Sequence, residues 1–114
     1  MGTNYYARYN ICPQCGRYDE LHICKISFGW KPLFQAYREE EYGVEIRSFR
    51  DWVEFWRQPD VKIVDEYGDE VEKEDFVGLL AIRHKYEGFK SHLKSDRGIW
   101  TDKEGYEFTY REFS

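Results

Sequence analysis

Three cysteines fall between positions 12 and 24, and this grouping limits the possible folds more than any other part of the sequence. A disulfide framework would use an even number of cysteines spread along the chain, so the pattern does not fit one. The string Cys12-Pro13-Gln14-Cys15-Gly16 instead predicts a tight turn that presents two thiolates to a metal ion. Gly16 can supply the positive φ that such a turn often needs.

His22 and Cys24 are expected to complete the metal site. They lie two residues apart in a strand-like segment, where residues i and i+2 share a face, so both could point at the ion held by Cys12 and Cys15. Three sulfurs and one imidazole suit tetrahedral zinc with no open position, which indicates a structural rather than a catalytic metal. Removing that metal is expected to unfold roughly the first thirty residues.

Other interpretations of the second ligand pair stay open. Cys24 could be a small buried hydrophobic residue, and His22 a hydrogen-bonded strand histidine. The Cys-x-x-Cys pair could also be a redox motif, although such motifs usually open a helix in a βαβ context that this sequence does not show. His84 or His92 could supply a missing ligand, but nothing around them in the sequence singles them out.

Length and composition predict one folded domain over residues 1–114. Aromatic residues make up 19% of the chain, and their large rings can fill a small core in which Leu and Ala are scarce. No apolar run approaches the roughly 18 residues that a membrane span requires. No secretory or myristoylation signal is recognised at the start. We therefore expect a cytoplasmic protein.

The periodicity of the chain predicts an α+β fold, with two helices packed on a small antiparallel sheet and a zinc knuckle over 5–28. Strands are expected over 5–11, 21–28, 33–37 and 61–67. Helices are expected near 49–57 and 74–86, and a β-hairpin over 98–113. Ser48 is the expected N-cap of the first helix, and Ile82 is an expected buried residue of the second. The glutamates at 39–41 are expected in a solvated loop.

Acidic residues are concentrated in residues 65–75, where seven acids and one Lys give a net charge of −6. They could solvate a turn and favour the start of the following helix. They could instead form a partner-binding patch that docks on a basic surface. The residues assigned to this patch are Asp65, Glu66, Asp69, Glu70 and Glu72.

Basic residues are concentrated in residues 83–97, which carry a net charge of +3. They could contact the phosphates of a nucleic acid, although the acidity of the whole chain argues against broad non-specific binding. The residues assigned to this alternative are Arg83, Lys85, Lys90, Lys94 and Arg97.

Several strings along the chain resemble a family of small, mostly uncharacterised phage and prophage proteins. They are MGTNYY at 1–6, the Cys/His segment from Cys12 to Lys25, Gly29-Trp30, the Trp52 helix, DEYG at 65–68 and EGYEF at 104–108. The resemblance implies a zinc-binding phage accessory protein and brings no known activity. Relatives tend to have a His near Gln35 and a Gly where Cys24 stands, so Cys24 could replace a ligand lost at position 35.

Three functions are consistent with these features. The first is a non-enzymatic phage protein that binds a host macromolecule stoichiometrically, for example as an inhibitor of a CRISPR effector or another defence nuclease. The second is a nucleic-acid-binding regulator. The third is a metal-dependent hydrolase using His84, His92, Glu87 and Asp96, although no HExxH motif, nucleophile elbow or phosphate loop is present. The first is the leading prediction.

Overall fold

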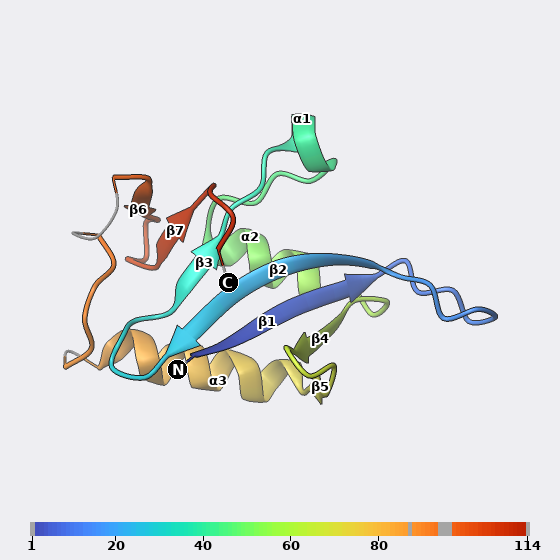
Figure 1. Ribbon diagram of the computed structural model, residues 1–114, viewed down its shortest axis with the longest axis horizontal. Coiled ribbons are helices and arrows are strands. Elements are labelled where there is room, and N and C mark those ends of the chain that lie inside the picture. The colour runs from blue at the N-terminus through green and yellow to red at the C-terminus, as the bar shows by residue number, and fades with distance from the viewer. Residues whose placement is uncertain (1, 87, 94–96, 114) are drawn as a thin grey trace.

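The computed structural model describes residues 2–86, 88–93 and 97–113, and over these ranges the chain forms a mixed sheet of seven strands with three helices (Figure 1). The predicted α+β class is thereby confirmed. The strands are β1 (Gly2–Tyr9), β2 (Asp19–Ser27), β3 (Leu33–Gln35), β4 (Lys62–Asp65), β5 (Glu70–Val71), β6 (Ile99–Thr101) and β7 (Glu107–Thr109). The helices are α1 (Glu39–Tyr42), α2 (Phe49–Trp56) and α3 (Lys73–Lys85).

The strand order is β5-β4-β1-β2-β3-β7-β6, and one neighbouring pair, β3 with β7, is parallel. The expectation of a purely antiparallel sheet is therefore wrong at this pair. β3 and β7 lie far apart in the sequence, so no hairpin turn links them, and Phe34 pairs with Phe108. Those two rings stack at a centroid distance of 5.1 Å in the core. Burial of these long-range aromatics brings the strands together.

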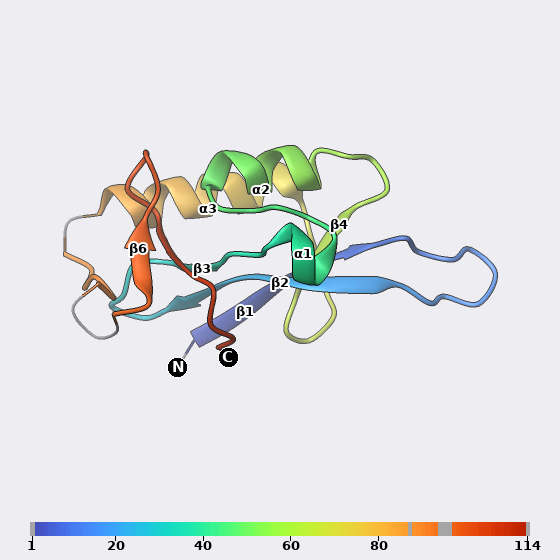
Figure 2. The same cartoon turned by 90° about the horizontal axis from the view of Figure 1, so that it is seen from above.

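Helices α2 and α3 cover the same face of the sheet (Figure 2). Trp52 and Trp56 of α2 and Phe76 and Leu80 of α3 are fully or almost fully buried between helices and sheet. Both predicted helices are confirmed. Ile82 is not part of this core, because its side chain is 70% exposed on the outer side of α3.

Local signals fix the start of α2 and the C-terminal hairpin as predicted. The Ser48 hydroxyl accepts a hydrogen bond from the Asp51 N–H at 3.1 Å, which caps the first turn of α2. Strands β6 and β7 form the expected hairpin, and the Gly105 N–H donates to the Asp102 carbonyl at 3.1 Å within its turn. The three glutamates at 39–41 are exposed as expected, but they form the short helix α1 rather than a loop.

Candidate functional site

Cys12 and Cys15 lie at the tip of a long arm that extends beyond the paired part of β1 and β2 (Figure 1). The Cys12 N–H donates to the Arg17 carbonyl at 2.7 Å, and the Gly16 N–H donates to the Cys12 carbonyl at 2.9 Å. The φ of +76° at Gly16 closes this turn. Backbone N–H groups, that of Cys15 foremost, and the Cys15 side chain are hydrogen-bonded to the Cys12 sulfur and lower the pKa of its thiol. The turn therefore favours the thiolate that a metal ion requires.

A β-bulge separates His22 from Cys24. Tyr6 and Tyr5 are adjacent in β1 but pair with His22 and Cys24, so Ile23 is the extra residue of β2. Ile23 and Cys24 both point into the core, and both are 0% exposed. His22 packs against Tyr6 on the opposite face of the sheet. The bulge thus reverses the alternation that would have placed His22 and Cys24 on one face.

His22 is half-buried in a hollow of about 280 Å³. The rings of Tyr6 and Phe113 lie at centroid distances of 5.1 and 4.7 Å from the imidazole. Its Nε2 lies 2.9 Å from Asn4 Oδ1, within hydrogen-bonding distance. Burial lowers the pKa of the imidazole, while the Cys24 backbone and the Gln35 side chain oppose that shift. His22 is a neutral, hydrogen-bonded strand histidine in this arrangement.

Cys24 behaves as a small core residue. It contributes to the main hydrophobic cluster, and burial raises the pKa of its thiol well above the ordinary value. The four predicted zinc ligands are therefore not brought together: Cys12 and Cys15 are neighbours, while His22 and Cys24 lie elsewhere. Among the residues that the structure describes, no three His, Cys, Asp or Glu side chains are placed to hold one metal ion. Zinc binding by Cys12 and Cys15 stays a prediction.

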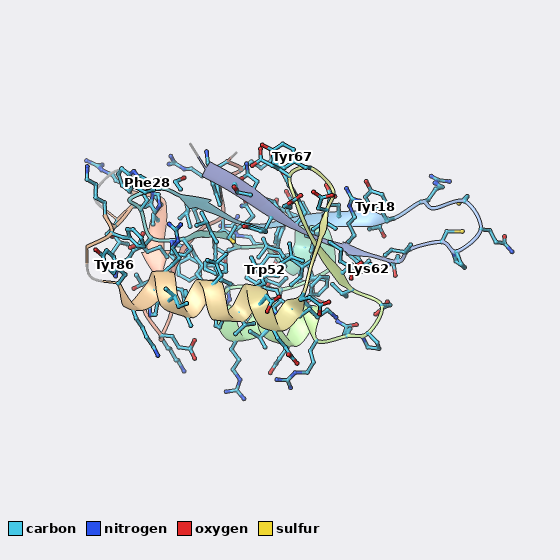
Figure 3. All side chains as sticks on the ribbon, turned by 90° about the horizontal axis from the view of Figure 1, so that it is seen from below. Tyr18, Phe28, Trp52, Lys62, Tyr67 and Tyr86 are labelled. Carbon is cyan, nitrogen blue, oxygen red and sulfur yellow. The ribbon has the colours of Figure 1, made fainter. Side chains whose placement is uncertain are left out.

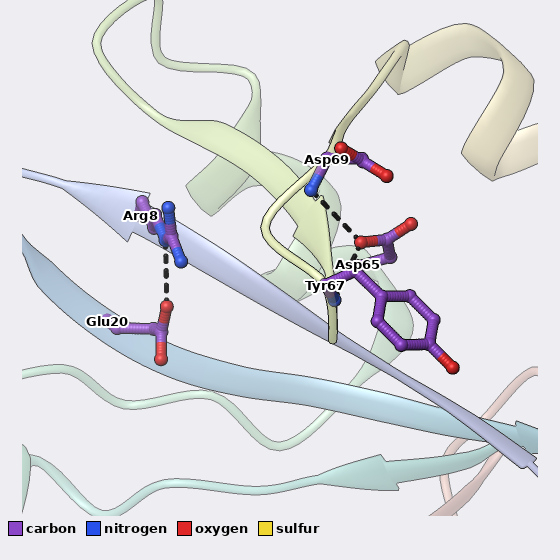
Figure 4. Close-up of polar contacts among 5 residues, drawn as sticks. All are labelled: Arg8, Glu20, Asp65, Tyr67 and Asp69. Carbon is purple, nitrogen blue, oxygen red and sulfur yellow. Dashed lines mark hydrogen bonds and ion pairs between the residues drawn. The ribbon is translucent and has the colours of Figure 1, made fainter.

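The predicted acidic patch forms the turn that joins β4 to β5. Asp65 Oδ1 accepts hydrogen bonds from the N–H groups of Tyr67 at 2.9 Å and Asp69 at 3.0 Å (Figure 4). The Gly68 N–H donates to the Asp65 carbonyl at 3.0 Å, and Gly68 has a φ of +84°. Asp65 therefore fixes the shape of the turn.

Glu66 also has a structural contact, because its Oε1 accepts the Asn4 N–H at 2.9 Å. The remaining acids of the patch, Asp69, Glu70 and Glu72, are exposed. Tyr67 precedes them on the same turn with 79% of its surface exposed (Figure 3), and the sequence did not single it out. In the sequence, its position directly before the glycine of a tight turn could have indicated that Tyr67 is exposed. We call Tyr67, Asp69, Glu70 and Glu72 the acidic turn.

The basic segment lies near the C-terminal end of α3. Arg83 covers the Phe89 ring at 4.9 Å, and Lys90 lies 5.6 Å from the Trp30 ring. Trp30 also stacks on His92 at a centroid distance of 4.8 Å. The structure thus brings two of the predicted phosphate contacts together with aromatic rings. Two others, Lys85 and Arg97, are exposed, and Lys94 lies outside the described residues.

The histidines proposed for hydrolysis are both engaged with backbone carbonyls. His84 Nε2 lies 2.9 Å from the Glu104 carbonyl and stacks on Tyr106 at 4.0 Å. His92 Nε2 lies 2.9 Å from the Lys31 carbonyl. Each of these contacts joins two distant segments of the fold. The other two residues of that hypothesis, Glu87 and Asp96, lie outside the described residues.

Within the described ranges, none of the helices has the length and apolar character that a membrane crossing demands. Comparisons of the chain with protein-family models, with curated proteins and with solved structures find no match.

Proposed function

We propose that this chain is a small phage-encoded accessory protein that binds a host protein stoichiometrically and without catalysis. The surface that it recognises is basic and normally binds nucleic acid, as in a defence nuclease such as a CRISPR effector. The phage origin rests on the sequence resemblance. The binding mode rests on one observation, the exposed Tyr67 followed by exposed acids on a turn whose shape Asp65 fixes.

The acidic turn has the physical properties of a protein-binding surface. Asp65 and Glu66 hold it to the sheet, so little conformational entropy remains to be lost when a partner binds. Tyrosine is enriched among residues that dominate binding energy, because its ring buries a large area at low entropic cost. The carboxylates of Asp69, Glu70 and Glu72 would meet Lys and Arg of the partner in place of phosphates.

Charge reversal on the turn tests this proposal. The triple variant D69K/E70K/E72K should lose capture of the partner from a lysate of the bacterial host, with bound proteins identified by mass spectrometry. The variant E39K/E40K/E41K on α1 is the matched control, because it makes the same change in net charge on another exposed segment and should keep the capture. Both variants should show unchanged thermal unfolding.

Competition tests whether the acids replace phosphates. Double-stranded DNA or heparin added to the captured complex should release the partner as the salt-dependent contacts are replaced. Tyr67→Ala should weaken capture by at least tenfold, equivalent to about 1.4 kcal/mol. Equal capture by the wild type, the turn variant and Tyr67→Ala would show that the acidic turn does not bind the partner.

A nucleic-acid-binding regulator is the second candidate, because Arg83 and Lys90 lie over aromatic rings at one end of the molecule. Such rings can stack on unpaired bases while the cations contact phosphates. Fluorescence anisotropy with a labelled single-stranded oligonucleotide tests this candidate. The double variant R83E/K90E should abolish any binding seen at low salt. If the wild type does not bind the oligonucleotide, the nucleic-acid-binding function is wrong.

A further inference from the structure

We infer that Cys12 and Cys15 form one half of a tetrahedral metal site, and that the other half is the same pair from a second copy of this chain. The site would take a divalent ion that prefers thiolate ligands, of which Zn²⁺ is the representative. The inference concerns the arm and does not depend on the proposed function of the acidic turn.

The turn at the tip of the arm holds two cysteines at the sequence spacing of a metal knuckle. Two cysteines at a Cys-x-x-Cys spacing occupy the same turn, which the hydrogen bonds of Cys12 with Arg17 and Gly16 close. Cys15 is exposed, so its sulfur is accessible from outside the molecule. The turn thus offers two of the four sulfurs that a tetrahedral site needs.

Nearby side chains that could add a third ligand are engaged in other contacts. At the base of the arm, Asp19 accepts the Asn10 side-chain N–H at 2.9 Å, and Glu20 pairs with Arg8 at 2.8 Å. Cys24 is fully buried in β2, five residues after Asp19. At roughly 3.3 Å per residue, this places it about 17 Å from the base of the arm. None of these three side chains can reach the tip of the arm while the strand pairing of β1 and β2 persists.

A second copy of the chain can supply the missing ligands, because the arm is exposed. Residues 13–20 are all exposed, and the arm carries the two cysteines away from the helices and the sheet (Figure 2). Two arms meeting tip to tip on a two-fold axis would place four sulfurs around one ion. The four thiols would release four protons, and no electron transfer is involved. The resulting centre has a net charge of −2, which the exposed Arg17 of each chain can offset.

Metal titration of the reduced full chain tests the inference. Zn²⁺ added in the presence of a phosphine reductant should bind at one ion per two chains. Native mass spectrometry and light scattering should show a mass twice that of the 13.9 kDa chain. A chelator should restore the monomer. Co²⁺ in place of Zn²⁺ should give the absorption of a tetrahedral site with four thiolates.

Variants identify the ligands. Cys12→Ser and Cys15→Ser should each abolish both metal binding and dimer formation while leaving thermal unfolding unchanged, because both residues lie on the arm. Cys24→Ala is the matched cysteine control and should retain both properties. One ion per single chain, a dimer that survives the chelator, or failure of Zn²⁺ to bind would each overturn the inference. Loss of binding in folded Cys24→Ala would also overturn it, in favour of a site within one chain.

Discussion

Trp52 joins α2 to the sheet by a polar contact as well as by packing. Its side chain is 0% exposed, and its indole N–H donates to the Gln35 carbonyl at 3.0 Å. Its ring also meets the Tyr37 ring edge-on at 6.0 Å. The contact matters because Gln35 ends β3, where the chain leaves the sheet. Trp52 therefore supplies a side-chain donor to a buried carbonyl at the end of β3.

Trp52→Phe should lower the free energy of unfolding by about 2–4 kcal/mol. The substitution leaves the Gln35 carbonyl without a donor and opens a small cavity. Urea denaturation followed by circular dichroism measures the change. Phe28→Ala is the control, because Phe28 is 86% exposed and its removal should change the free energy by less than about 0.5 kcal/mol. A loss below about 1 kcal/mol for Trp52→Phe would contradict the role given to the hydrogen bond.

His22 should make the stability of the fold depend on pH. Burial lowers its pKa below the ordinary value of 6.5, so the unfolded chain binds a proton at a higher pH than the folded chain does. The stabilising effect of a neutral His22 is fully present above pH 6.5. It is lost as the pH falls through the lowered pKa of the folded state. Unfolding free energies measured by urea titration should therefore decline below pH 6.5.

Comparison with His22→Gln isolates this effect from the carboxylates that titrate at lower pH. Glutamine cannot be protonated in this range but can keep a hydrogen bond with Asn4. The difference in unfolding free energy between wild type and variant should favour the wild type less as the pH falls below 6.5. A difference that does not change with pH would show that His22 titrates alike in the folded and unfolded chains.

At the scale of the elements, the arm is separable from the sheet that it extends. Tyr9 and Asp19 are paired directly, so a two-residue Asn-Gly turn can replace residues 10–18 and close the hairpin there. The unfolding free energy should change by less than about 1 kcal/mol. The replacement removes the hydrogen bonds internal to residues 10–18, the hydrogen bond between Asn10 and Asp19, and the contact of Arg8 with Tyr18.

The shortened chain also tests metal binding, because it lacks Cys12 and Cys15 but keeps Cys24. It should fold with the same circular dichroism spectrum and should not bind Zn²⁺. If it failed to fold, the arm would be part of the folding core rather than an extension of it. Thermal melts and metal titrations on the same preparation give both answers.

Elements with local signals could be predicted from the sequence. Ser48 as N-cap and the periodic aromatic residues after it located α2 to within a residue. The turn at 102–105 located the β6–β7 hairpin in the same way. The signals for these elements lie in the side chains next to the backbone that they shape, so short stretches of sequence contain them.

Features that depend on distant partners could not be predicted. The bulge at Ile23 lies in the pairing of β2 with β1, where the buried residues change from positions 21 and 23 to positions 24 and 26. The register of this pairing shows where the change occurs. Glu107 is another case, since it is 3% exposed and accepts hydrogen bonds from the Ser91 hydroxyl and the His92 N–H. A glutamate in a hairpin is expected to be exposed. Its burial can be expected only when the segment that donates hydrogen bonds to its carboxylate is known. The bulge at Ile23 places His22 and Cys24 on opposite faces of the sheet. The arm holds Cys12 and Cys15 beyond the paired strands, so the structure does not bring the four predicted ligands together.

On the scale of the whole molecule, the acidic turn and the paired cysteines lie on different projections. The acidic turn joins β4 to β5, and the cysteines are at the end of the β1–β2 arm. A partner could therefore occupy one without blocking the other. Two chains joined through their arms would present two acidic turns, which raises the apparent affinity for a partner with two basic sites when the spacing fits. The two proposals are thus compatible but independent.

This separation predicts the effect of removing the metal. A chelator should dissociate two zinc-linked chains while each remains folded, because the arm tip makes no part of the core cluster. The midpoint of thermal unfolding should move by less than about 4 °C, equivalent to under about 1 kcal/mol for a domain of this size. Amide hydrogen exchange should show unchanged protection at Leu21 and Cys24, which are paired with β1. Loss of protection there on chelation would instead mean that the metal holds β2 in place, as ligation by His22 and Cys24 would require.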